Sequence, residues 1–293
     1  MVGFIAERML SLETITQDEP FILVDSNIDS VQTGAAGWYR DAIYPTKRFC
    51  EMDIAVLDEV QRNVVISEAF FSHDSVHTVP RVAEEMAKIG AILKDKQTCL
   101  AKYEKKARSR DSNTWRKVDD EQKSERRELF ADLCWRFDKL ARKAALVTYR
   151  PQDSAVFETL YSVALNVAAL THAKVDFGVR YGDPSRVEND IHADEELVAT
   201  ALYRTMVERE PCAIVSMDTD IIRITRWVHR YLGAIDPAIR VYCRMPSDTE
   251  YGMYIDTAQV PKKFHLPSAD KRLIDLAQEA LHKLPLEIAK PFL

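Results

Sequence analysis

The chain has 293 residues, of which 46% are apolar, and its 40 Lys and Arg against 46 Asp and Glu give a formal net charge of −6. This apolar content excludes a wholly disordered chain, and the low counts of 8 Gly and 12 Pro exclude a collagen-like or low-complexity repeat. An acidic chain disfavours nucleic acid as a partner unless its basic residues are gathered in one region.

The first third of the chain predicts two strands and two helices. An apolar, β-branched run over 21–24 predicts a buried strand that leads into a polar loop. Apolar residues at helical spacing predict a helix over 51–66, and residues 75–79 predict a weaker strand. Pro80 favours the start of a helix that runs beyond Ile89, because the first helical turn needs no N–H from that position.

The rest of the chain predicts a charged helical segment followed by alternating strands and helices. Residues 94–150 contain neither Gly nor Pro, and we interpret them as two long helices in a hairpin that breaks near 108–113. The later elements are predicted as strands over 212–216, 240–243 and 251–256 and helices over 156–170, 194–207, 221–231 and 269–282. This alternation predicts an α/β protein with a mostly parallel sheet.

The five cysteines are odd in number and form no CxxC pair, so neither a disulfide framework nor a zinc site is expected. We predict that they are buried, reduced thiols. Residues 1–16 lack the pattern of a signal peptide, and no apolar run approaches the roughly 18 residues that cross a bilayer. A cytoplasmic protein without membrane contacts is therefore expected.

Acidic residues follow both strongly apolar strands, Asp25 after the first and Asp218 with Asp220 after the second. Ligands of parallel sheets bind beyond the carboxyl ends of the strands, so these acids are expected to converge. Glu85 and Asp194 lie in the first halves of helices that follow such strand ends. Gathered carboxylates repel one another unless a cation lies between them, which predicts Mg²⁺ or Mn²⁺.

Each of these acids also has an ordinary structural interpretation. Asp25 suits a turn or a helix N-cap, and Asp194 favours a helix N-terminus. Asp218 and Asp220 suit the cap of the helix that follows them, while Glu85 suits a solvated helix face. The order and spacing of the acids are more informative than any single one of them.

Four short blocks, in this order, resemble the PIN-domain nuclease superfamily. The first is the strand and Asp-Ser-Asn of residues 21–27, and the second is the proline-initiated helix of residues 78–86. The third is an Asp that opens an Ala-rich apolar helix over 194–202, and the fourth is a strand that ends in Ser-x-Asp-x-Asp over 213–220.

The resemblance implies a PIN-like three-layer sandwich, in which a mostly parallel central sheet is flanked by helices and carries an inserted helical hairpin. We expect one PIN-like domain over 1–293, with a helical insertion over 91–170 and a C-terminal extension of the core over 235–293. Because both additions exceed a compact PIN domain, the substrates and partners of the small toxin members are not carried over.

The resemblance also implies an endoribonuclease that hydrolyses phosphodiester bonds with a divalent metal. Its implied metal ligands are Asp25, Asp194 and Asp218. Glu85 and Asp220 are implied as further ligands or as residues that hold the water of the metal. Glu85 is also implied as a base that orients the attacking water. Three alternatives to the chosen acids stay open, namely Glu84 for Glu85, and Asp190 or Glu195 for Asp194. His192 is a further candidate for lining the cleft.

Candidate substrate contacts come from the strand ends and from the charged segment. Ser26 and Ser216 are assigned either to phosphate binding or to turns, and Asn27 either to substrate or to the loop around Asp25. Residues 91–150 hold 17 basic and 10 acidic residues, whereas the remainder holds 23 and 36. Lys105, Lys106 and Arg108 belong to its densest basic cluster and are predicted to bind the phosphate backbone.

A helical hairpin with a solvated, mixed-charge face is the alternative for this segment, with Trp115, Trp135 and Phe137 as packing residues. The leading functional hypothesis is a Mg²⁺- or Mn²⁺-dependent nuclease acting on RNA, or on DNA. A non-catalytic PIN-like scaffold that binds RNA or a protein is the alternative, and a small-molecule phosphohydrolase is the second. Self-association and an inhibitory protein partner are both left open.

Overall fold

The computed structural model describes residues 8–26, 54–91, 94, 120–175, 192–217, 221–222, 224–225, 228, 239–244, 250–254, 279 and 282–285. The chain divides into two compact units. Residues 1–25, 75–81 and 149–293 form the first, here the sheet unit, and residues 26–74 and 82–148 form the second, here the helical unit. The predicted domain boundaries stay predictions.

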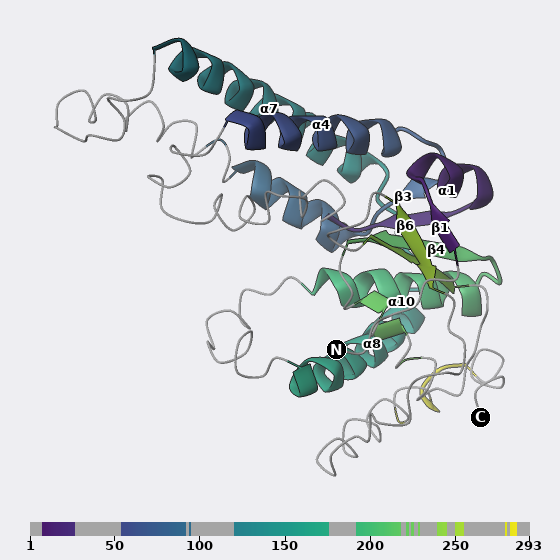
Figure 1. The fold of residues 1–293 in the computed structure, drawn as a ribbon. Helices are drawn as coiled ribbons and strands as arrows, with labels where there is room; N and C mark the ends of the chain where they lie inside the picture. The colour runs from purple at the N-terminus through teal and green to yellow at the C-terminus, as the bar shows by residue number, and fades with distance from the viewer. Residues whose placement is uncertain are drawn as a thin grey trace. The chain divides into compact units, whose positions relative to one another are not determined.

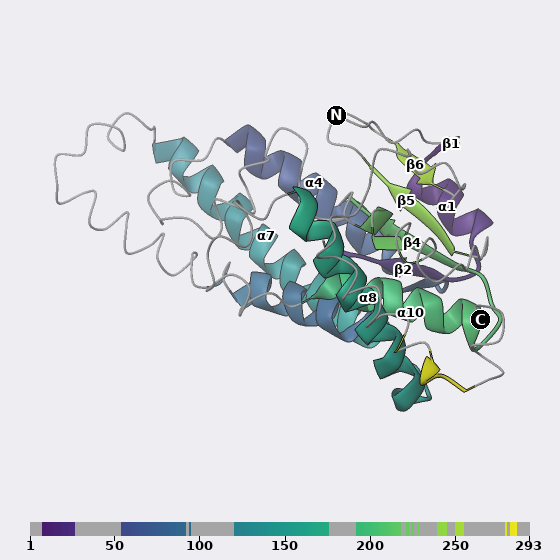
Figure 2. The ribbon, with the colours of Figure 1, turned by 90° about the horizontal axis from the view of Figure 1, so that it is seen from below.

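The sheet unit is built on six strands in the order β1-β6-β5-β4-β2-β3, and Figure 2 shows the first five of them side by side. Their bounds are β1 Arg8–Leu10, β2 Ile22–Val24, β3 Val76–His77, β4 Cys212–Ser216, β5 Ile239–Cys243 and β6 Tyr251–Tyr254. Strands β5, β4, β2 and β3 are mutually parallel, whereas β6 runs antiparallel to both of its neighbours. The prediction of an α/β protein with a mostly parallel sheet is confirmed.

The two central strands are buried along their whole length. In β2 and β4 the pairs Ile22–Ala213, Leu23–Ile214 and Val24–Val215 lie in register. Strands covered on both faces are expected to read as continuous apolar runs, and the sequence of both strands does so. The register aligns the residues that follow the two strands at the same edge of the sheet.

Three helices of the sheet unit have defined bounds, α1 Leu12–Asp18, α8 Ser154–Val175 and α10 Ala193–Met206. Helix α10 packs against β2, β4 and β5 on one side and against α8 on the other, and Figure 1 shows it between them. Its buried residues include Leu197, Val198 and Leu202.

The N-terminal elements β1 and α1 were not predicted. Strand β1 pairs with β6 at the edge of the sheet, Met9 opposite Gly252. Helix α1 begins after Ser11, whose Oγ accepts a 3.2 Å hydrogen bond from the backbone N–H of Thr14. This hydrogen bond satisfies one of the donors that a helix start leaves free, so Ser11 is an N-cap.

The helical unit contains α4 Ile54–Phe70 and α7 Asp120–Leu146, which pack side by side (Figure 1). A further helix covers residues 80–91, and a Cβ built on its Gly90 would lie 3.8 Å from Cδ1 of Phe137 in α7. Helix α7 covers the part of the chain that was predicted to form the second arm of a hairpin. The first arm, the break near 108–113 and the cluster around Lys105 lie outside the described residues.

Three of the cysteines, Cys134, Cys212 and Cys243, are buried free thiols, as predicted. Burial raises the pKa of the Cys134 thiol to about 12 and raises that of Cys212 further. Cys50 and Cys99 lie outside the described residues. Across the helices that the structure describes, none combines the length and apolar character that a membrane span requires.

Candidate active site at the carboxyl edge of the sheet

The order of the parallel strands reverses between β2 and β4. From β2 the chain continues to β3 on one side, and from β4 it continues to β5 on the other side. Ligands of open parallel sheets bind at the carboxyl ends of the strands beside such a reversal. The residues that lie there are Asp25, which follows β2, and Ser216, which ends β4.

Asp25 and Ser216 are joined by a hydrogen bond at this edge. The Ser216 hydroxyl donates to Oδ2 of Asp25 over 2.7 Å, and the backbone N–H of Asp25 donates to the carbonyl of Val215 over 3.1 Å. Asp25 is only 2% exposed and Ser216 is fully buried. A carboxyl group in such a place is costly unless hydrogen bonds or a cation compensate for the lost water.

Thr78 fixes the end of β2 from the other neighbouring strand. Its Oγ1 donates a 2.8 Å hydrogen bond to the carbonyl of Val24, and its own carbonyl accepts one of 2.9 Å from the N–H of Tyr149. Thr78 is fully buried. This support for the residue before Asp25 was not predicted, because a threonine at a strand end has no distinctive sequence signal.

The first turn of α10 carries three consecutive acids, Asp194, Glu195 and Glu196. Asp194 is half-buried, whereas Glu195 and Glu196 are 5% and 7% exposed. Nδ1 of His192 lies 3.3 Å from Oε1 of Glu195, and His192 itself has a left-handed backbone with φ of 54°. His192 was predicted as a candidate for lining the cleft, and Glu195 as an alternative to Asp194. The two side chains contact each other at the start of α10.

Glu196 was not singled out from the sequence, yet its side chain contacts Arg81 through both carboxylate oxygens. Its Oε2 accepts a 2.7 Å hydrogen bond from the backbone N–H of Arg81, whose Nε lies 3.9 Å from Oε1. Burial raises the pKa of the Glu196 carboxyl, and the hydrogen bond and charge of Arg81 oppose that rise. The guanidinium of Arg81 also lies 4.9 Å from the ring centre of Tyr161.

Within the helical unit, Ser26 and Glu85 form a second serine–carboxylate pair. The Ser26 hydroxyl donates a 2.6 Å hydrogen bond to Oε2 of Glu85, and Ser26 is 5% exposed. The alternative acid, Glu84, is exposed and forms a 2.9 Å ion pair with Lys88 one turn later. Of the two neighbouring glutamates, Glu85 is the one that contacts a predicted site residue.

The remaining predicted site residues lie outside the described residues. They are Asn27, Lys105, Lys106, Arg108, Asp190, Asp218 and Asp220. Among the residues that the structure does describe, no three His, Cys, Asp or Glu side chains gather as a metal-holding group. Two of the three implied metal ligands, Asp25 and Asp194, belong to the described part, and the third, Asp218, does not.

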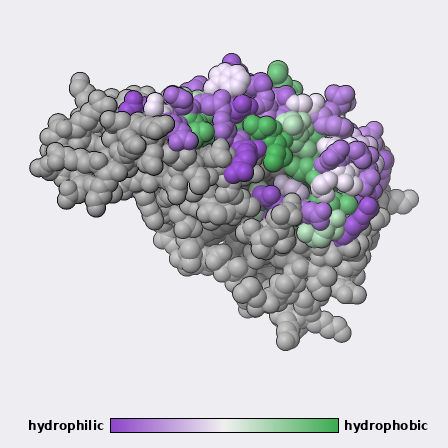
Figure 3. All heavy atoms as spheres, turned by 45° about the horizontal axis from the view of Figure 1, so that its top comes forward, coloured by the Kyte–Doolittle hydropathy of each residue, from purple (hydrophilic) through white to green (hydrophobic). Residues whose placement is uncertain are grey.

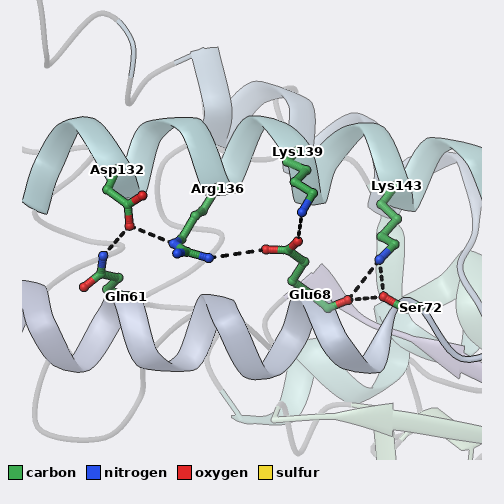
Figure 4. A network of polar contacts seen from close by, with 7 residues as sticks. All are labelled: Gln61, Glu68, Ser72, Asp132, Arg136, Lys139 and Lys143. Carbon is green, nitrogen blue, oxygen red and sulfur yellow. Dashed lines mark hydrogen bonds and ion pairs between the residues drawn. The ribbon is translucent and has the colours of Figure 1, made fainter.

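Three basic residues of α7 make contacts within the helical unit, as Figure 4 shows. Arg136 contacts Asp132 on its own helix at 2.7 Å and Glu68 of α4 at 3.7 Å, and Lys139 also pairs with Glu68. Lys143 donates to the hydroxyl of Ser72 and, over 3.3 Å, to the carbonyl of Glu68. These contacts make the seam between α4 and α7 polar.

The exposed surface of the helical unit is mixed in character. Helix α7 has seven basic and six acidic residues, so it carries little of the positive charge of residues 91–150. Phe137 is 1% exposed and packs as the alternative interpretation predicted, whereas Trp135 is 55% exposed beside Arg136 and Lys139. On the face drawn in Figure 3, hydrophobic residues lie between hydrophilic ones in the described part of the chain.

Arg244 is a further charged residue at the carboxyl edge, and sequence reasoning missed it. It directly follows β5, and its backbone N–H donates a 3.2 Å hydrogen bond to the carbonyl of Ser216. Its Nη2 lies 3.6 Å from Sδ of Met217. A single arginine after a strand belongs to no motif, so only the register of β4 and β5 brings it to Ser216.

No protein-family model, curated protein or solved structure matches this chain.

Proposed function

We propose that the protein is a PIN-like nuclease that hydrolyses phosphodiester bonds in RNA with Mg²⁺ or Mn²⁺. The observation that carries the proposal is the place of Asp25. Its carboxyl group lies buried at the carboxyl end of β2, beside the reversal of strand order and hydrogen-bonded to Ser216 of β4. This is the part of an open α/β sheet where ligands bind.

In this proposal Asp25, Asp194 and Asp218 hold the metal, and oxygen donors of this kind suit Mg²⁺ and Mn²⁺. A bound divalent ion would lower the pKa of its water and offset negative charge on the phosphate. Ser216 fixes the Asp25 carboxyl group through its hydroxyl. Glu85, which accepts a hydrogen bond from Ser26, would orient the attacking water, with Asp220 as a further ligand or holder.

The finer structural assignments belong to the same proposal. They are the PIN-like three-layer sandwich, a single PIN-like domain over 1–293, a cytoplasmic location and RNA as the nucleic acid that is bound. The confirmed α/β sheet supports the first of them, because its parallel strands end at one edge, where Asp25 lies.

The test compares Asp25→Asn with wild-type protein and with Asp18→Asn, whose carboxyl group is exposed at the end of α1 beside Arg8. Cleavage of a fluorescent single-stranded RNA is measured with Mn²⁺, and Mn²⁺ binding is measured by calorimetry. We expect Asp25→Asn to lower the cleavage rate by at least about 100-fold and to weaken Mn²⁺ binding, and Asp18→Asn to match the wild type.

Each alternative function gives a different result in this test. A non-catalytic scaffold would bind RNA but neither bind Mn²⁺ nor cleave. A small-molecule phosphohydrolase would hydrolyse a phosphate monoester and leave the RNA intact. Equal RNA cleavage by wild-type protein and Asp25→Asn would overturn the proposal itself.

A further inference from the structure

Three neighbouring strands end at the carboxyl edge of the sheet. Val24 of β2 lies opposite Val215 of β4, and Ser216 of β4 lies opposite Cys243 of β5. Asp25 is therefore level with Ser216, and Arg244 lies one position beyond Cys243, level with Met217. Because the strands are parallel, an acid and a base flank the end of β4 at the same edge.

The guanidinium group of Arg244 lies at this edge and has few hydrogen-bond acceptors among the described residues. Nη2 contacts Sδ of Met217, which is a weak acceptor, and the guanidinium carbon lies 5.8 Å from the ring centre of Tyr251. Nε is buried and has no hydrogen-bond partner. Within the described residues, no carboxylate forms an ion pair with Arg244.

Two other arginines of the sheet unit are paired with carboxylates. Arg204 pairs with Glu208 and Glu210, although its Nε is likewise buried without a hydrogen-bond partner, and Arg240 of β5 donates a 2.6 Å hydrogen bond to Glu19. These two guanidinium groups are therefore matched with carboxylates. Arg244 departs from that pattern at the edge where the substrate is expected, and a buried donor without an acceptor favours binding of an anion that supplies one.

We propose that Arg244 binds a phosphate oxygen of a single-stranded RNA substrate. The planar guanidinium group presents parallel N–H donors that match the oxygens of a phosphodiester, and phosphate is a stronger acceptor than the sulfur of Met217. The binding of the anion follows from the contacts of Arg244, whereas its identification as the scissile RNA strand rests on the proposed function.

The experiment measures binding and cleavage separately in the full-length protein. Binding of a fluorescein-labelled 12-nucleotide oligouridine is followed by anisotropy in EDTA, and cleavage of the same RNA is followed in Mn²⁺. The variants are Arg244→Gln, Arg244→Lys and the matched control Arg8→Gln, whose side chain is 61% exposed in β1. Circular dichroism and thermal unfolding establish that each variant is folded.

We expect Arg244→Gln to weaken RNA binding by about 10-fold or more, Arg244→Lys to weaken it less, and Arg8→Gln to leave it unchanged. The slope of log affinity against log salt is expected to fall by about 0.7 in Arg244→Gln, because one phosphate contact is lost from a single strand. A purely structural role for Arg244 would leave this slope unchanged.

The outcomes separate this inference from the proposed function. If binding depends on Arg244 but wild-type protein does not cleave in Mn²⁺, phosphate binding stands and the nuclease proposal fails. Equal affinity and salt slope in wild-type protein and Arg244→Gln would overturn the inference, as would absence of RNA binding by the wild type. If Arg244→Gln does not fold, unchanged affinity of folded Arg244→Lys would overturn it instead.

Discussion

The Ser216 hydroxyl donates a 2.7 Å hydrogen bond to the Asp25 carboxyl group and so joins residues that are 191 positions apart in the chain. Both residues are buried at the ends of adjacent parallel strands, β4 and β2. The contact ties the position of the leading candidate acid to the register of the sheet. Changes in this pair are therefore expected to affect both stability and activity.

Ser216→Ala removes the donor and leaves Oδ2 of Asp25 without this hydrogen bond. We expect the free energy of unfolding to fall by about 1 to 3 kcal/mol, because a buried acceptor loses its partner. Urea unfolding followed by circular dichroism measures the change. Ser124→Ala, at an exposed position in α7, is a control that should cost much less. A loss below about 0.5 kcal/mol in Ser216→Ala would show that the hydrogen bond adds little to stability.

Glu196→Gln tests the acid that the fold holds against Arg81. Because burial raises the pKa of Glu196 in the folded protein, the folded state binds its proton more tightly than the unfolded state does. The stability linked to that proton is present below the ordinary pKa of 4.5 and is lost as the pH rises through the raised value.

The amide cannot ionise, so the stability of Glu196→Gln relative to wild type is expected to increase as the pH rises from about 4 towards 8. Urea unfolding at a series of pH values measures the difference. Curves for the two proteins that run parallel over this range would contradict the predicted coupling between Glu196 ionisation and folding.

Glu68→Gln tests the polar seam between α4 and α7 (Figure 4). The carboxylate pairs with both Arg136 and Lys139, and its side chain is only 14% exposed. We expect the loss of both ion pairs to lower the free energy of unfolding by about 1 to 2 kcal/mol. Partial exposure of the two cations keeps this value below that of a fully buried ion pair.

The control for this prediction is Glu84→Gln, because Glu84 and Lys88 form an exposed ion pair within one helix. Such pairs contribute about 0.3 to 0.5 kcal/mol. The two variants are compared by urea unfolding with a probe in the helical unit. An equal effect of both substitutions would mean that the seam is no stronger than an ordinary surface ion pair.

Trp135→Ala and Leu133→Ala distinguish the two sides of α7. Leu133 is fully buried, so its truncation is expected to cost about 2 to 5 kcal/mol. Trp135 is 55% exposed, so its truncation is expected to cost less than about 1 kcal/mol. Thermal unfolding of both variants measures the contrast. A large loss in Trp135→Ala would assign that side chain to packing, as the alternative interpretation of the sequence did.

The central strands were predictable because burial on both faces leaves a local signature. Strands β2 and β4 each correspond to an apolar run, and four or five residues of such a run are enough to predict a buried strand. Strand β1 has only three residues, the first two of which are exposed, and it is held by pairing with β6 more than 240 positions later. No local pattern reports such a long-range pairing, so β1 was missed.

The same distinction applies to the candidate site. Asp25 and Ser216 were found because they lie at the ends of recognisable strands, and the rule that parallel strands share an edge predicted that the acids after those strands converge. The hydrogen bond between Asp25 and Ser216 was not predicted. The contact between Glu196 and the backbone of Arg81 spans 115 positions and involves no motif. Arg244 was missed for the same reason, because only the register of β5 beside β4 places it at the carboxyl edge of the sheet.

The position of β2 between β3 and β4 has a consequence for synthesis of the chain. About 190 residues separate β2 from β4, so at roughly 5 to 20 residues per second β4 emerges some 10 to 40 seconds after β2 has been made. During this interval the apolar β2 has only β3 to pair with, whereas α4 and α7 of the helical unit are already synthesised. Asp25 therefore reaches the ribosome exit long before Ser216, and the carboxyl edge is completed only after β4 and β5 have been made.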